Sequence, residues 1–396
     1  MNDLPLAGVR ILAFEQFGAG PFATLNLADM GAEVIKIEDP TTGGDVSRFV
    51  PPYRSEADSI YFQSWNRNKK SFTLNLRKAE AREVLLGLVR ASDVVFNNLR
   101  SDQPAKLGLT YEHLGPVYPK IVCCSLSGFG SQSSRAKEPG YDYLMQAAAG
   151  YMSVTGDPMS PPTACGVSFI DHAAGFAAAL GMVSAVLAAR TTGIGRDVEV
   201  SLADTSLSML TYLAAWTMNR GFEPRRYAGS AHQTLVPVQT FRTSDGYLTI
   251  FCGKEKFWRE LCDCFGDRAL AQRFDAFESR LEHRDEVVTA VQAHFLRRPN
   301  AEWLELLANK IPCSPVRSMP EALESAAVEG LGAVIEVEHP EWGTLREVNT
   351  PARFSGIARR RHEAAPTLGA HTVPILKEYL GYNDSRIAEL RQQGAI

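Results

Sequence analysis

Asp171 is the residue of this 396-residue chain whose type and position point most directly to chemistry. It lies in the segment Gly166–Gly175, at the start of an Ala/Gly-rich stretch that runs to Arg190 and predicts a buried helix. Unpaired backbone N–H groups and the helix dipole at such a start favour an ionised carboxylate. An ionised carboxylate can attack an activated acyl group. Asp is also a common N-cap residue, so position alone leaves a purely structural role open.

The overall composition argues against nucleic-acid-binding, disulfide-rich and zinc-binding proteins. A net charge of −4, a pI near 6.1 and the lack of a Lys/Arg run argue against a nucleic-acid partner. Seven cysteines, including adjacent Cys123 and Cys124, form neither an even disulfide framework nor pairs at zinc-ligand spacing. We therefore expect reduced thiols, no metal site and a cytoplasmic location.

Two segments bear on targeting and membranes. Met1–Pro5 has no basic and apolar leader pattern, so we expect no signal peptide. Ala173–Ala189 approaches the length of a bilayer span, but Ala and Gly dominate it and Ser184 interrupts it. We interpret it as a close-packed internal helix and expect no membrane partner.

The first half of the chain alternates strand and helix patterns, which predicts an α/β fold with a parallel sheet covered by helices on both faces. The expected strands are Val9–Phe14, Glu33–Ile37, Ser71–Leu74, Val94–Phe96, Ile121–Ser125 and Asp197–Leu202. The expected helices between them include Pro21–Met30 and Ala79–Arg90. Ligands of such sheets bind at the carboxyl ends of the strands.

The pattern changes after a polar linker at Gly221–Gly229. Val238–Arg242 and Tyr247–Cys252 flank Ser244–Gly246, which has the composition of a hairpin turn, and helical patterns follow. We predict a smaller α+β domain over residues 225–325. Residues 1–220 and 326–396 would form the large domain.

A glycine motif follows the first strand and suggests a competing function. Gly18, Gly20 and Ala23 fit the G-x-G-x-x-(G/A) pattern of nicotinamide dinucleotide sites, and Glu38 lies about 20 residues further on. Pro21 removes a backbone donor from the loop that would bind the pyrophosphate. A dehydrogenase is thus an alternative, while coenzyme A is another nucleotide ligand that such a loop can serve.

Taken together, segments along nearly the whole chain resemble the class III coenzyme A transferases, the family that includes formyl-CoA transferase, carnitine CoA-transferase and the α-methylacyl-CoA racemases. The matching segments are Pro5–Leu12, Gly18–Pro21, Leu27–Glu38, Gly44–Arg48, Asn68–Ser71, Asn98–Arg100, Ser127–Gly130, Gly140–Asp142, Gln146, Gly166–Gly175, Gly195–Arg196, Ser244–Gly246, Thr350–Gly356 and Leu368–Thr372.

The resemblance implies a Rossmann-like large domain built from both chain ends, a smaller domain between them, and an interlocked homodimer. It also implies that Asp171 attacks an acyl-CoA to form an acyl-aspartyl anhydride and then an aspartyl-CoA thioester. No tightly bound cofactor is expected, because the coenzyme A thioester is itself a substrate. We expect backbone N–H groups at the start of the Asp171 helix to stabilise the oxyanions.

By the same match, several residues would contact coenzyme A: Gln16, Phe17, Gly18, Leu74, Asn98, Leu99, Arg100 and Lys106. Tyr141 and Asp142 would orient the substrate or the site. Asp39 stands where formyl-CoA transferase has a basic residue that touches the nucleotide, and the tetraglycine loop of that enzyme is missing. These departures argue against formyl-CoA as the donor.

We expect succinyl-CoA as donor and a small dicarboxylic acid as acceptor, with Arg48, Arg226 or His232 binding the second carboxylate. Two further alternatives stay open. An α-methylacyl-CoA racemase would carry a Gly-His-Asp run, but Tyr141 follows Gly140 here. A CoA-binding protein without catalytic activity would have no need of Asp171.

Overall fold

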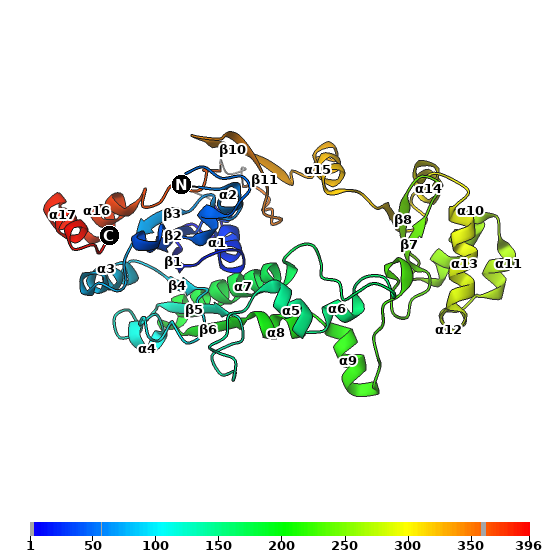
Figure 1. Ribbon diagram of the computed structural model, residues 1–396, viewed down its shortest axis with the longest axis horizontal. Helices are drawn as coiled ribbons and strands as arrows, with labels where there is room; N and C mark the ends of the chain where they lie inside the picture. Colours follow the sequence, from blue (N-terminus) through cyan, green and yellow to red (C-terminus); the bar gives the residue numbers. More distant parts are fainter. Residues whose placement is uncertain (1–3, 57, 358–361) are drawn as a thin grey trace. The chain divides into compact units, whose positions relative to one another are not determined.

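The computed structural model describes residues 4–56, 58–357 and 362–396, which divide into two compact units (Figure 1). Unit 1 consists of residues 1–149, 166–210 and 329–396, and unit 2 of residues 150–165 and 211–328. Residues 1–3, part of the segment in which we expect no signal peptide, lie outside the described residues.

A six-stranded parallel sheet forms the centre of unit 1. Its strands are β1 (Arg10–Phe14), β2 (Glu33–Glu38), β3 (Lys70–Thr73), β4 (Val94–Asn97), β5 (Val122–Ser127) and β6 (Asp197–Ser201). The order across the sheet is β3-β2-β1-β4-β5-β6, which is the Rossmann order. The direction of winding reverses between β1 and β4, and open sheets of this kind bind ligands at the carboxyl ends beside that point. The α/β prediction is confirmed.

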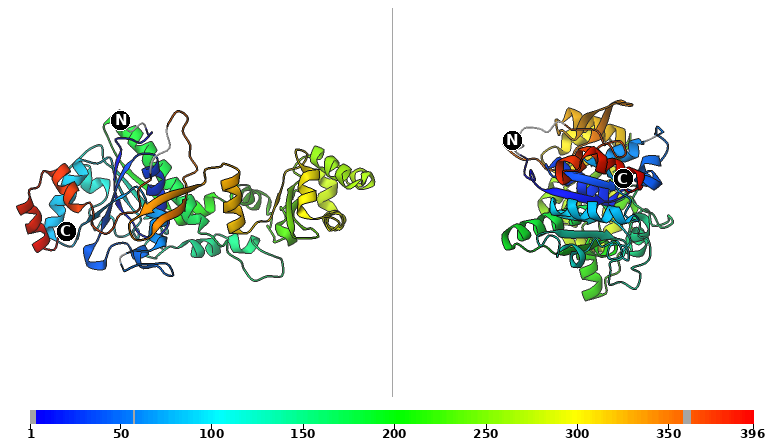
Figure 2. Two further views of the ribbon diagram at one scale, coloured as in Figure 1. Left: turned by 90° about the horizontal axis from the view of Figure 1, so that it is seen from above. Right: turned by 90° about the vertical axis from the view of Figure 1, so that its left-hand side faces the viewer.

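Helices cover both faces of this sheet (Figure 2). One face packs against α3 (Ala79–Arg90), α4 (Tyr111–Leu114), α16 (Thr372–Leu380) and α17 (Asp384–Gln392). The other face carries α1 (Ala19–Asp29) and α7 (Phe169–Thr192), which pack against each other. The inner strands β1, β4 and β5 are buried on both faces and consist largely of apolar residues, whereas the edge strands β3 and β6 contain more polar ones.

The C-terminal part of the chain is grouped with the N-terminal part in unit 1. It contributes α16, α17 and the antiparallel hairpin β10 (Val334–His339) and β11 (Gly343–Val348). The remaining helices of unit 1 are α2 (Ile60–Asn66), α5 (Asp142–Ala148) and α8 (Leu202–Ser208).

Helix α7 is the one helix among the described residues that is long and apolar enough to cross a membrane by length and composition. It contacts α1, β5 and β6, and residues such as Ala178 and Met182 are buried there. Its opposite face exposes Phe176, Leu180 and Leu187 at helical spacing. The helix is therefore internal on one side and uncovered on the other.

Unit 2 has its own core. A three-stranded antiparallel sheet, β7 (Val238–Arg242), β8 (Tyr247–Phe251) and β9 (Cys313–Pro315), packs with helices around Trp258, Phe295 and Trp303. The helices of unit 2 are α6 (Tyr151–Val154), α9 (Thr211–Arg220), α10 (Glu255–Phe265), α11 (Arg268–Arg273), α12 (Phe277–Glu282), α13 (Arg284–Phe295), α14 (Asn300–Leu307) and α15 (Met319–Val328).

The two largest differences between the observed units and the predicted boundaries concern residues 150–165 and helix α9. Residues 150–165 and helix α9 group with unit 2, whereas the sequence assigned both to the large domain. Two helices, α8 and α9, follow β6, and the chain breaks between them where Thr211, the first residue of α9, adopts a left-handed φ of 47°. No periodicity in the sequence marks such a break.

Candidate active site

The start of helix α7 is capped by a side chain from another helix. Asp142, the first residue of α5, is buried, and its Oδ2 accepts hydrogen bonds from the N–H of Ile170 (2.7 Å) and of Asp171 (3.3 Å). Its Oδ1 accepts one from the buried Gln146 side chain. Ser168, at the N-cap position of α7, makes no side-chain cap. Asp142 therefore supplies the carboxylate that the helix start attracts.

This cap overturns two expectations about α7. Asp171 lies in the first turn but is not the cap, and the N–H groups of Ile170 and Asp171 are occupied by Asp142. The next N–H group, of His172, donates to Ser168 O at 3.2 Å. The start of α7 thus has no free donors for an oxyanion, and the prediction that they come from there is wrong.

The carboxyl group of Asp171 accepts no hydrogen bond from any of the described residues. Burial, and secondarily the charge of Asp142, raise the pKa of Asp171 to about 7. The expectation of a strongly stabilised, ionised carboxylate is therefore corrected. Asp171 is held in its charged form only weakly, as a group poised between acid and carboxylate near neutral pH.

The loop after strand β1 approaches Asp171 closely. A Cβ atom added at Gly18 would lie 3.1 Å from Asp171 Oδ2, so a larger residue would press on the carboxyl group. Gly175 permits this arrangement, because a Cβ there would lie 2.9 Å from Ala19 O of helix α1. The close packing of α7 on α1 therefore brings the two helix starts together.

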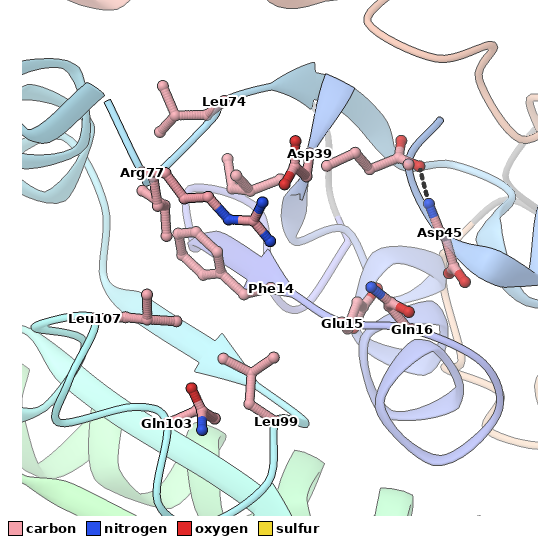
Figure 3. A pocket seen from close by; sticks show the side chains of 14 residues that line it. Phe14, Glu15, Gln16, Asp39, Asp45, Leu74, Arg77, Leu99, Gln103 and Leu107 are labelled. Carbon is pink, nitrogen blue, oxygen red and sulfur yellow. Dashed lines mark hydrogen bonds between the residues drawn. The ribbon is translucent and has the colours of Figure 1, made fainter. Parts of the chain in front are cut away.

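Two adjoining pockets lie along the carboxyl ends of the strands. The first, of about 320 Å³, contains Asp171 and is lined by the predicted residues Gln16, Phe17, Gly18, Asn98, Leu99, Arg100 and Tyr141. The second, of about 340 Å³, shares Gln16 and Leu99 with the first and adds the predicted residue Leu74 (Figure 3). Seven of the eight residues predicted to contact coenzyme A thus line one continuous region next to Asp171.

Arg77 is a residue of the second pocket that the sequence reasoning missed. Its side chain points into the pocket beside Phe14 (Figure 3), and its guanidinium has no ion-pair partner among the described residues. It follows strand β3 as Arg100 follows β4, and this shared position is the feature that could have revealed it. Asp39 lines the same pocket and caps a short turn by accepting from the Thr41 N–H at 2.8 Å.

Lys106, the eighth predicted contact, lines neither pocket. Its Nζ pairs with Asp102 at 2.6 Å, and Arg100 pairs with the same carboxylate at 2.5 Å. Arg100 and Lys106 are both well exposed, so these pairs exchange readily with solvent.

Arg48 and Arg226, which we expected to bind a second carboxylate of the substrate, already form hydrogen bonds within the protein. Arg48 is buried and binds both oxygens of Glu38, each at 2.9 Å. In unit 2, Arg226 donates to backbone oxygens, including Met152 O at 2.7 Å. The structure thus leaves neither guanidinium fully available to a substrate.

His232, also in unit 2, is held as a neutral ring. Its Nδ1 accepts from the N–H groups of Thr234 (3.1 Å) and Leu235 (3.0 Å), and its Nε2 faces Tyr212 at 3.2 Å. Burial, and secondarily Arg284, lower the pKa of His232. A neutral imidazole offers no positive charge to a carboxylate.

Comparisons with known proteins identify the family of the chain. The family model CoA-transferase family III matches residues 6–372. A succinyl-CoA:glutarate CoA-transferase of Mus musculus is 34% identical over 99% of this chain and 90% of its own length. A succinate–glutarate CoA-transferase of Agrobacterium fabrum is 32% identical over 94% of this chain and 95% of its own.

Solved structures of similar proteins have the same fold as this chain. A CAIB/BAIF family protein from Brucella suis superposes with a TM-score of 0.81 at 30% identity, covering 95% of this chain and 99% of that one. An orthorhombic crystal structure from Mycobacterium tuberculosis gives a TM-score of 0.83 at 28% identity, covering 94% and 99%.

Replacing Asp171 with Asn should stabilise the fold, and more so as the pH rises. The folded pKa of about 7 exceeds the ordinary value near 3.9. The parent therefore loses stability as the pH rises between these values, and the full penalty, on the order of a few kcal/mol, is present above the folded pKa. Melting temperatures near pH 5 and near pH 8 test this.

The matched control is Asp275→Asn, at an exposed position. Its effect on the melting temperature should be the same at both pH values. If the stabilisation by Asp171→Asn were equal at both, Asp171 would be ionised in the folded protein at low pH, against our account.

Proposed function

The chain belongs to CoA-transferase family III, and on this basis we propose that it moves coenzyme A from succinyl-CoA to a small dicarboxylic acid through intermediates on Asp171. Members of the family are enzymes that transfer coenzyme A, and so is this chain. The finer proposal is carried by the half-buried Asp171 carboxyl group, which accepts no hydrogen bond from the described residues and lies in a pocket at the carboxyl edge of a Rossmann sheet.

The proposed reaction begins with attack of the Asp171 carboxylate on the thioester carbonyl. The C–S bond breaks, coenzyme A leaves as a thiolate, and an acyl-aspartyl anhydride forms. The thiolate then attacks the aspartyl carbonyl, so that succinate leaves and an aspartyl-CoA thioester remains. The acceptor carboxylate attacks this thioester, and the returning thiolate cleaves the new anhydride at the acceptor acyl group. Asp171 is regenerated as a carboxylate.

The environment of Asp171 suits this chemistry. A carboxylate that accepts no hydrogen bond from the described residues has its electrons free for attack. An anhydride formed there would have to be shielded from water, and the half-buried position of Asp171 limits that access. A carboxyl nucleophile also leaves each intermediate activated, so that no step has to regenerate a high-energy bond.

The donors for the developing oxyanions would come from helix α1. The backbone N–H groups of Gly18, Ala19 and Gly20 donate to no other described residue, and α1 has no side-chain cap. This helix start lies against Asp171 at Gly18. Such donors commonly contribute about 3 kcal/mol to acyl-transfer transition states.

Coenzyme A would lie along the two adjoining pockets. The pocket with Arg77 suits the phosphate-bearing nucleotide, because no described residue forms an ion pair with the Arg77 guanidinium. The thioester end would pass Gln16 and Leu99, which belong to both pockets, and reach Asp171.

The dicarboxylate substrate is proposed from the relatives that transfer coenzyme A between succinate and glutarate. Other relatives act on oxalate or mesaconate, which are also dicarboxylates. Tyr141 lines the Asp171 pocket in the position where the racemase resemblance requires His, which supports transfer over racemisation.

We also propose a homodimer, interlocked as the resemblance implies. The uncovered apolar face of α7, with Phe176, Leu180, Val183 and Leu187 between 36% and 70% exposed, supports a second copy of the chain as its cover.

A panel of donors and acceptors tests the proposed substrates. Succinyl-CoA with glutarate should give a kcat/KM at least tenfold above that with butyrate, which lacks the second carboxylate. Equal rates with mono- and dicarboxylic acids would contradict dicarboxylate specificity. Exchange of an α-hydrogen with deuterated water in the absence of an acceptor would indicate a racemase, and a change in nicotinamide absorbance a dehydrogenase.

Asp171→Ala should abolish turnover and retain the binding of coenzyme A. Removal of a covalent nucleophile typically lowers kcat by several orders of magnitude, whereas the nucleotide pocket with Arg77 is untouched. Steady-state kinetics and calorimetric titration with free coenzyme A measure the two effects. Residual activity within about tenfold of the parent would exclude Asp171 as the nucleophile.

Asp142→Asn should move the acid limb of the kcat/KM profile to lower pH. The parent needs ionised Asp171, so its kcat/KM should rise with pH up to about 7. Removing the Asp142 charge removes one cause of the raised pKa of Asp171, while Asn retains an oxygen that can accept from the helix start. An unchanged limb, or one at higher pH, would show that Asp142 does not act on Asp171 through its charge.

A further inference from the structure

The loop Gln16–Gly18 holds an unfavourable backbone conformation beside the reacting carboxyl group. Phe17 has a φ of 59°, in the left-handed region, which costs a residue with a Cβ atom roughly 1–2 kcal/mol. Such a conformation persists only where surrounding contacts enforce it. Gly18, the next residue, is the one that lies against Asp171 Oδ2.

Two side chains hold this loop from opposite sides. Asn98, which follows β4, accepts from the Gln16 N–H at 2.9 Å and donates to Gln16 O at 2.7 Å. Asp45, in the segment after β2, accepts from the Phe17 N–H at 3.2 Å. Since β2 and β4 are the two neighbours of β1, the loop that leaves β1 is clamped from both.

Asp45 is itself fixed by buried charge. Its Oδ2 lies 2.8 Å from Lys36 Nζ, and its Oδ1 also accepts from the Ser47 N–H at 2.9 Å. Lys36 in turn donates to Glu15 O at 2.9 Å, so it holds the residue that immediately precedes the loop. Asp45 and Lys36 are each at most 1% exposed, which leaves them no solvent alternative to these partners.

Both ends of the Asn98 amide bond protein backbone. One oxygen and one nitrogen bond Gln16, and the side chain also packs on the first turn of α1, where a Cβ at Gly20 would lie 2.8 Å from Asn98 Cγ. This geometry gives Asn98 a different task from the coenzyme A contact that the resemblance implies.

We propose that Asn98, together with Asp45, is a positioning residue that sets the gap between the Gly18 backbone and Asp171, and that it does not act by binding coenzyme A. The inference rests on the proposed role of Asp171 as nucleophile. Reacting atoms must approach within about 3–3.5 Å, so a loop that relaxes by a few tenths of an ångström slows the chemical step. Affinity for the nucleotide, which lies in the Arg77 pocket, is left nearly unchanged.

The experiment compares three variants of the full-length protein. Asn98→Leu keeps the shape of the side chain and its packing on Gly20 but removes both hydrogen bonds to Gln16. Asn98→Ala removes the packing as well. Arg77→Ala is the comparison that should weaken coenzyme A binding. Each is measured for kcat, for KM with succinyl-CoA and for the Kd of free coenzyme A.

We expect both Asn98 variants to lose about 30-fold or more in kcat with less than about threefold change in the Kd of coenzyme A. Arg77→Ala should instead raise the Kd of coenzyme A and leave kcat nearly unchanged. A tenfold rise in Kd with kcat within twofold of the parent would make Asn98 a ligand of coenzyme A and overturn the inference. Unfolding of both Asn98 variants, seen by circular dichroism, would also overturn it, since Asn98 would then support the domain rather than the loop.

These outcomes are separable from failure of the proposed function. If Asp171 were not the nucleophile, Asp171→Ala would keep its turnover. The effects of the Asn98 variants on kcat and on the Kd of coenzyme A are measured on those variants themselves. They can therefore be interpreted whether or not Asp171→Ala keeps its turnover.

Discussion

The pKa and reactivity of Asp171 depend on which of two carboxyl groups, Asp142 or Asp171, accepts the backbone N–H groups at the start of α7. Asp142 accepts the backbone N–H groups of Ile170 and Asp171, so the half-buried carboxyl group of Asp171 lies near a second negative charge and accepts no hydrogen bond from the described residues. The fold tolerates this unfavourable arrangement because Gln146 and the helix dipole stabilise Asp142. What is poor for stability is useful for catalysis, since a weakly stabilised carboxylate reacts readily with an acyl group.

The opposite wall of the site depends on buried charge. Three cations (Lys36, Arg48 and Lys69) and three carboxylates (Glu15, Glu38 and Asp45) lie at most 3% exposed beside the loop that leaves β1. Their ion pairs include Lys36–Asp45 at 2.8 Å and Lys69–Glu15 at 2.8 Å. Lys69 also donates to Pro21 O at 3.0 Å, which ties the cluster to helix α1. Removal of any one member would leave an uncompensated buried charge, so the cluster resists rearrangement.

Much of the fold can be predicted from the sequence because the strands of a parallel sheet are continuous apolar runs, and Val94–Phe96 and Ala79–Arg90 were located almost to the residue. Asp171 and most of the pocket residues could also be named. The capping of α7 by Asp142 could not be predicted, because Ile170 and Asp171 lie 28 and 29 positions further along the chain than Asp142. Lys36 and Lys69 look like ordinary surface residues in the sequence, although both are buried. The sequence also gives no sign that Arg48 pairs with Glu38 whereas Arg77 has no ion-pair partner among the described residues, because only folding brings such partners together.

The most direct test of covalent catalysis by Asp171 follows oxygen from the acceptor acid. In the proposed sequence the acceptor carboxylate contributes the bridging oxygen of the second anhydride, and that oxygen stays with Asp171 when the thiolate attacks the acceptor acyl group. Turnover of succinyl-CoA with ¹⁸O-labelled glutarate should therefore place ¹⁸O in the peptide that contains Asp171, as read by mass spectrometry. Retention of all label in the acid and its thioester, or its appearance on a different side chain, would contradict the account.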